Sequence, residues 1–182
     1  MTALPTIPLG GTVVDISSQG GGVANMGDID YETADFWLSF PGQTYYRVRL
    51  RAGTQYGTLI ESGTVGNLGF DIRDWVAIPY APGILVAVAT HPELPDRTSI
   101  LYFFTDTKQW QVVTTFDYPS SSGWSAMYGS NNGSLYATDA QTGQILGFPV
   151  DGAGGGEPFL ASQGPSPGTL HDGAICAIGF RL

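Results

Sequence analysis

The sequence predicts an all-β fold, and three observations lead to this prediction. Turn-forming and aromatic residues are frequent, with 26 Gly, 12 Pro, 4 Trp, 9 Tyr and 9 Phe among 182 residues. Apolar residues do not keep the 3.6-residue period of an amphipathic helix in any sustained window. Short runs of alternating apolar and polar residues lie instead between turn signals. This alternation is typical of strands, because successive side chains of a strand point to opposite faces.

The clearest strand pattern lies in residues 123–151. Three alternating runs are separated there by two turn signals; the runs are 125–128, 134–138 and 144–150, and the turns are Asn132-Gly133 and Thr142-Gly143. Asn-Gly between two such runs favours a two-residue type I′ turn, which needs positive φ at both central residues. The stretch therefore predicts three antiparallel strands in a meander.

An internal repeat sets the architecture. Four segments open with small or acidic residues and continue into an apolar strand; they are residues 27–31, 73–77, 123–127 and 172–176. Their aligned positions, Asp28, Asp74, Ser125 and Gly173, lie 46, 51 and 48 residues apart. A period near ~48 residues fits the four-stranded blade of a β-propeller. We therefore predict a β-propeller-like repeat of four-stranded antiparallel blades.

Each repeat unit carries further strand signals after its opening. Strands are expected at 36–40, 45–50 and 57–61 in the first unit, at 75–78, 84–89, 100–104 and 110–115 in the second, and at 157–161 to end the third. Residues 91–97, with Pro92 and Pro95, are expected to form a surface loop.

The length fits one domain covering residues 1–182. The expected units are 25–66, 67–120 and 121–170, with 5–17 and 171–182 combining into a fourth, split blade. Joining the two ends would close the ring and remove exposed sheet edges. The alternative is half of a larger propeller, which would leave edges open for pairing with a second copy.

Charge and composition narrow the class of partner. The net charge is −9, the charged fraction is 13% and the pI is near 4.3. Attraction to nucleic acid or to an anionic membrane is therefore not expected, and no apolar run is long enough to span a bilayer. An unidentified small ligand, a glycan or a protein remains as the expected partner, and a homodimer is a further option.

The compartment stays open. The sequence begins without the basic and apolar regions of a signal peptide. We expect a secreted protein if this chain is the trimmed part of a longer one, and a cytoplasmic protein otherwise. Cys176 is the only cysteine, so it forms no internal disulfide.

Several motifs in order along the chain resemble a known group. They are 25–30 (NMGDID), 56–63 (YGTLIESG), 74–79 (DWVAIP), 123–128 (GWSAMY), 147–150 (GFPV), Gly164-Pro165 and 172–176 (DGAIC). Together they resemble a mostly fungal and often secreted family of β-propeller-like repeat proteins with no assigned activity. The resemblance covers most of the chain and departs at Ile175, where the pattern leads us to expect a basic residue. It implies a propeller-type fold and no particular activity.

Four aspartates recur at the starts of the expected inner strands, where propeller blades converge on a central channel. They are Asp28, Asp30, Asp74 and Asp172. Converging carboxylates are suitable ligands for a hard cation, so these residues are candidates for a calcium site. The alternative is that each aspartate caps a turn or accepts hydrogen bonds from N–H groups of the neighbouring blade.

The ligand-binding candidates are Trp75, Trp124, His171 and Asp172. Flat indole faces beside polar groups can stack on sugar rings. Trp75 and Trp124 also occupy equivalent repeat positions, which favours packing between blades instead. His171 and Asp172 lie near Cys176 in the sequence, but a lone Cys on an apolar strand is usually buried and inert.

We interpret the chain as a non-enzymatic binding or protein-interaction module that uses its loops and channel mouth. Two alternatives remain: a metal-dependent hydrolase or lyase of the propeller lactonase type, and a self-associating scaffold subunit. Motifs of serine hydrolases, phosphate-binding loops and zinc sites are not present in the sequence.

Overall fold

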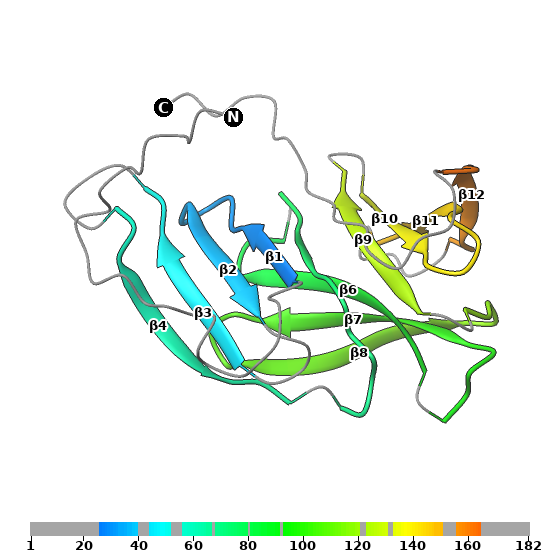
Figure 1. Cartoon of the computed structure of the whole chain (residues 1–182), viewed down its shortest axis with the longest axis horizontal. Helices are drawn as coiled ribbons and strands as arrows, with labels where there is room; N and C mark the ends of the chain where they lie inside the picture. Colours follow the sequence, from blue (N-terminus) through cyan, green and yellow to red (C-terminus); the bar gives the residue numbers. More distant parts are fainter. Residues whose placement is uncertain are drawn as a thin grey trace, which may run out of the picture.

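The computed structural model describes residues 26–39, 44–51, 56–66, 68–79, 81–91, 93–120, 123–130, 133–150 and 156–164. These residues form twelve strands, and no helix is present among them. The strands build three four-stranded antiparallel sheets (Figure 1). The predictions of an all-β fold and of four-stranded antiparallel blades are confirmed.

The three sheets follow one another along the chain, and we call them blades 1, 2 and 3. Blade 1 contains β1 (Met26–Ile29), β2 (Asp35–Ser39), β3 (Thr44–Arg49) and β4 (Leu59–Thr64). Blade 2 contains β5 (Val76–Ala77), β6 (Ile84–Thr90), β7 (Thr98–Phe104) and β8 (Gln109–Phe116). Blade 3 contains β9 (Trp124–Gly129), β10 (Ser134–Asp139), β11 (Ile145–Pro149) and β12 (Phe159–Ser162). The expected split blade, 5–17 with 171–182, lies outside the described residues.

The blades are arranged like the segments of a fan (Figure 1). Strands follow chain order within each sheet, so β1, β5 and β9 are the first strand of their blades. β1 contacts β5, and β5 contacts β9. First strands that contact one another, with later strands farther out, give the propeller-like fold. None of the described residues belongs to a helix long and apolar enough to cross a membrane.

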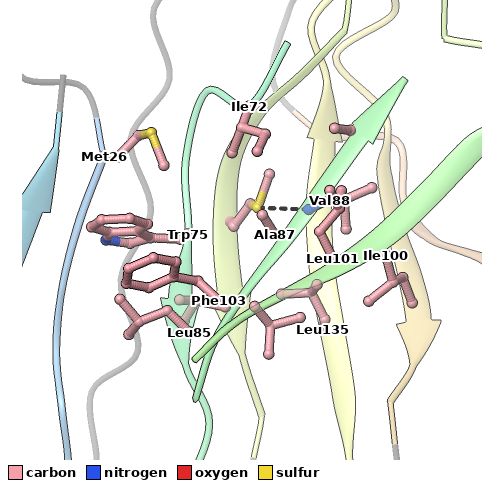
Figure 2. Packing of buried hydrophobic residues seen from close by; sticks show 14 of the residues in the cluster. Met26, Ile72, Trp75, Leu85, Ala87, Val88, Ile100, Leu101, Phe103 and Leu135 are labelled. Carbon is pink, nitrogen blue, oxygen red and sulfur yellow. Dashed lines mark hydrogen bonds between the residues drawn. The ribbon is translucent and has the colours of Figure 1, made fainter. Parts of the chain in front are cut away.

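One hydrophobic core runs through all three blades. At its centre the rings of Trp75 and Phe103 stack with centroids 5.5 Å apart, as Figure 2 shows. Phe103 also meets Trp37 of blade 1 edge-on at 6.2 Å. On the other side of blade 2, the Val88 N–H donates to Met127 Sδ of blade 3 at 3.4 Å (Figure 2). Buried side chains of neighbouring blades therefore pack against one another in this shared core.

Three hairpins share one turn geometry. Ala34, Lys108 and Gly143 each have positive φ, of 55°, 60° and 75°. The N–H of each donates to the carbonyl four residues earlier, in Asp30, Phe104 and Asp139, at 2.8 Å in every case. Glycine adopts this left-handed conformation without strain, whereas Ala34 and Lys108 do so at a steric cost of about 1 kcal/mol.

The turn after β9 is described only in part, because Asn132 of the expected Asn132-Gly133 turn lies outside the described residues. Gly129 pairs with Leu135 across the base of this hairpin. The expected positive φ is present at Gly133, at 87°.

Ala34→Gly should stabilise the protein by about 0.5–1 kcal/mol, because glycine removes the left-handed strain at the cost of a more flexible unfolded chain. Urea unfolding at equilibrium measures this change. Ala137→Gly is the matched control: Ala137 is buried in β10, so the same change there should destabilise. A lower urea midpoint for Ala34→Gly would contradict the strain argument.

Candidate functional site

Asp28 and Asp74 join neighbouring blades through their carboxylates. Asp28 Oδ1 accepts from its neighbour, Ile29 N–H, at 2.8 Å, and Asp28 Oδ2 accepts from Ala77 N–H of blade 2 at 2.9 Å. Asp74 repeats the arrangement: Oδ1 accepts from Trp75 N–H at 2.9 Å and Oδ2 from Met127 N–H of blade 3 at 2.8 Å. Both carboxylates are buried. Asp28 thus links β1 to β5, and Asp74, two residues before β5, links the start of blade 2 to β9.

Asp30 accepts a hydrogen bond within its own turn and does not join two blades through it. Its Oδ1 accepts from Glu32 N–H at 2.9 Å within the β1–β2 turn. Asp139, which the sequence analysis missed, does the same for Gln141 N–H at 2.8 Å in the β10–β11 turn. Both are aspartates at the start of a tight turn, the position that favours such a bond.

The described members of the expected calcium site, Asp28, Asp30 and Asp74, do not come together as a metal-binding group. Among the described residues, no group of three or more His, Cys, Asp or Glu side chains could hold a metal ion. Asp28, Asp30 and Asp74 instead accept backbone hydrogen bonds, as the alternative interpretation of these residues supposed. Asp172, the fourth candidate, lies outside the described residues.

Trp75 and Trp124 lie between blades. Both side chains are fully buried. Trp75 Nε1–H donates to the Trp37 carbonyl of blade 1 at 3.3 Å, and Trp124 Nε1–H donates to Thr98 Oγ1 of blade 2 at 3.2 Å. Neither indole has a face exposed for a sugar, so the expected stacking role is replaced by packing between blades. The other ligand-binding candidates, His171 and Asp172, and the nearby Cys176 lie outside the described residues.

A charged cluster on blade 1 was not found from the sequence. Asp35 is completely buried and accepts from Arg47 Nε at 2.7 Å and from Arg49 Nε at 2.5 Å. Arg47 Nη1 also lies 3.5 Å from Glu61 Oε2. The strand register explains these pairs, because Asp35 lies opposite Arg49 and Arg47 lies opposite Glu61. Alternating Arg47 and Arg49 in one strand is the signal that could have indicated the cluster.

Blade 2 completes this cluster with Lys108. Its Nζ lies 2.8 Å from Glu61 Oε1, and the Tyr45 hydroxyl donates to the same oxygen at 2.6 Å. Burial and the bond to Glu61 raise the pKa of Tyr45 to about 12. Burial alone would raise the pKa of Glu61, but the hydrogen bonds from Lys108 and Tyr45 outweigh it and hold that pKa below its ordinary value. Glu61 is therefore a carboxylate and Tyr45 a neutral phenol at neutral pH.

Two neighbouring loops expose leucine side chains. We call residues 68–72, His91 and residues 93–97 the loop pair. The Phe70 and His91 rings join its two halves, with centroids 5.3 Å apart in an edge-on arrangement. Leu68 is 54% exposed and Leu94 is 40% exposed. Each of the two loops thus carries one large, exposed apolar side chain.

The backbone of the loop pair is ordered by its own contacts. His91 N–H donates to the Arg97 carbonyl at 2.9 Å, and Arg97 N–H donates to the Leu94 carbonyl at 2.9 Å. Leu68 has a φ of 52°, in the left-handed region that favours glycine. The acidic residues of the loop pair, Asp71, Glu93 and Asp96, are exposed.

No protein-family model and no curated protein matches this chain. Among solved structures, the chain is similar to that of U3-55K at 10% identity, with a TM-score of 0.49, over 83% of this chain and 42% of that one. It is also similar to the Dos1 propeller at 8% identity, with a TM-score of 0.49, over 76% of this chain and 37% of that one. The chain thus spans about two fifths of the length of these structures. The propeller-like fold described above rests on the three sheets themselves.

Asp74→Ala should lower the free energy of unfolding by at least about 2 kcal/mol, because the buried N–H groups of Trp75 and Met127 lose their acceptor. Urea unfolding measures the loss. Asp71→Ala is the control, since the Asp71 side chain is 56% exposed and pairs with Arg73 at the surface. Equal stability of the two variants would show that the carboxylate of Asp74 does not hold the blades together.

Glu61→Gln should reduce stability at neutral pH by about 1 kcal/mol or less, since the carboxylate is partly exposed. The folded-state pKa of Glu61 lies below the ordinary value of 4.5. Its contribution is therefore fully present above that value and is lost as the pH falls through the folded-state pKa. Thermal unfolding from about pH 7 to pH 3 should show the two proteins converging in acid. A difference that stays constant with pH, or a similar effect of Glu93→Gln on the exposed loop, would contradict the assignment.

Proposed function

We propose that this chain is a non-enzymatic protein-interaction module and that the loop pair is the surface it presents. The observation that carries this proposal is Leu68, a large apolar residue that is more than half exposed and held at a φ of 52°. Strained backbone at non-glycine residues occurs mostly where surrounding structure enforces it, often at functional positions. Because the Leu68 side chain is exposed, packing in the core does not account for its strained backbone.

The charge of the surface favours one kind of partner. Asp71, Glu93 and Asp96 are exposed on the loop pair, and the whole chain carries a net charge of −9. Asp71 pairs with Arg73, and Arg97 of the loop pair pairs with Asp117. Exposed carboxylates on loops that also expose leucines complement a protein segment with an apolar anchor and basic flanking residues. The backbone hydrogen bonds among His91, Leu94 and Arg97 hold the second loop in one conformation, which reduces the entropic cost of binding.

The test is affinity capture from an extract of the source cells with three forms of the chain. The Leu68→Asp/Leu94→Asp variant should lose the proteins that the wild type retains, because it replaces both exposed leucines with charged side chains. Aspartate also tolerates the left-handed region better than leucine does, so the fold should survive. Val113→Asp, the matched control on the exposed part of β8, should retain the same proteins as the wild type.

The same proteins retained by all three forms would overturn the proposal. Light scattering across a concentration series provides a further comparison. A dimer that Val113→Asp dissociates would favour the alternative of a scaffold that self-associates through β8. Among the described strands β8 is the last of its sheet, and its Val112 and Val113 are exposed.

A further inference from the structure

The side chain of Lys108 ends among three residues of the neighbouring blade. Its ammonium lies 5.2 Å from the centroid of the Trp37 ring and 5.8 Å from that of the Tyr45 ring. Glu61 Oε1 is 2.8 Å away, and the ammonium also donates to the Thr105 carbonyl within its own turn. We call Trp37, Tyr45 and Glu61 the ammonium box.

The box belongs to blade 1 alone and is held in place by its own contacts. Its members lie on three adjacent strands, β2, β3 and β4. The rings of Trp37 and Tyr45 stack with centroids 5.6 Å apart, and the Tyr45 hydroxyl fixes the Glu61 carboxylate at 2.6 Å. Arg47 supports the opposite oxygen of Glu61 at 3.5 Å. The arrangement therefore does not depend on Lys108 for the relative placement of the three residues.

These groups are the chemistry that recognises organic cations. Aromatic faces attract an ammonium through their quadrupole, and a carboxylate adds a charge-assisted hydrogen bond. Trp37 and Tyr45 are buried with Lys108 in place, and the site meets solvent at Lys108 and Glu61, whose side chains are 22% and 29% exposed. The Arg47 guanidinium also lies 5.2 Å from the Trp37 centroid. The same indole ring therefore makes cation–π contacts with two cations.

The turn position of Lys108 does not itself require a lysine. Lys108 occupies the left-handed position of its turn, with a φ of 60°. The equivalent positions in the β1–β2 and β10–β11 turns are Ala34 and Gly143, and glycine fits there without strain. Lys108 can therefore be replaced by glycine without changing the course of this backbone.

We propose that the ammonium box is a binding site for alkylammonium groups, such as a lysine or methylated lysine side chain of a partner protein. Lys108 fills it as an internal ligand. A partner lysine binds when the β7–β8 turn releases Lys108, so the internal ligand lowers the apparent affinity of the site in proportion to its own occupancy. This inference concerns a different surface from the loop pair and does not depend on it.

Lys108→Gly empties the box and suits the left-handed turn, so the variant should fold. The probe is n-butylammonium chloride, which reproduces the lysine side chain, measured by calorimetric titration against sodium chloride at equal ionic strength. Lys108→Gly should bind it at least roughly tenfold more tightly than the wild type, because no internal cation competes. Lys108→Gly/Glu61→Gln should lose this gain, and Ala34→Gly should behave as the wild type because it makes the same backbone change without emptying the box.

Failure of folded Lys108→Gly to bind the probe would overturn the proposal. Equal binding by Lys108→Gly and the wild type, or by Lys108→Gly and the double variant, would also overturn it, since the cation would then bind elsewhere. Near-ultraviolet circular dichroism reports whether the variant is folded. If it is not, Lys108→Asn, which also tolerates positive φ, replaces it in the same titration.

Discussion

The arrangement of the three blades depends on the hydrogen bonds that side chains supply to backbone N–H groups at the unpaired edge of a first strand. β1, β5 and β9 each begin a sheet, so among the described strands each has a neighbour within its blade on one side only. Backbone N–H groups on the other side are buried and need an acceptor. Asp28 supplies it to Ala77, and Asp74 supplies it to Met127. A short side chain thus replaces a missing strand, and the same bond fixes the spacing between consecutive blades.

The two seams between blades share this principle but differ in the side chains around it. At each seam an aspartate reaches forward to the next blade, and an indole N–H reaches back, from Trp75 to blade 1 and from Trp124 to blade 2. Blade 3 does not continue the series in the described residues. Its aligned residue is Ser125, whose hydroxyl donates to the Thr138 carbonyl of its own blade at 3.2 Å.

Local sequence patterns predicted the strands, whereas the roles of individual side chains depend on contacts between residues that are far apart in the sequence. The run at 84–89 was recognised as a strand and β6 spans Ile84–Thr90, because alternation and flanking turns are local signals. The role of Asp28 could be stated only as a choice between metal ligand and backbone acceptor, since its partner Ala77 belongs to the next repeat. The box of Trp37, Tyr45 and Glu61 was missed entirely, because Lys108 reaches it from another blade.

The contacts of Lys108 with blade 1 are separate from the stack of Trp75 on Phe103 and from the Asp28 hydrogen bond. A ligand that displaces Lys108 would therefore change the first set of contacts and leave the other two in place. Trp75 and Phe103 stack in the interior, and Asp28 holds the first strands together, whether or not Lys108 lies in the box. Lys108 lies in the short β7–β8 turn, between Phe104 and Gln109. Its side chain reaches Glu61 of blade 1 from that turn. Its release would remove the ammonium that lies 5.2 Å from the Trp37 centroid and 5.8 Å from the Tyr45 centroid, while the hydrogen bond from Ala77 to Asp28 involves no atom of Lys108. Binding at this seam is therefore a local rearrangement, in which one cation replaces another while the inner hydrogen bonds keep the fold intact.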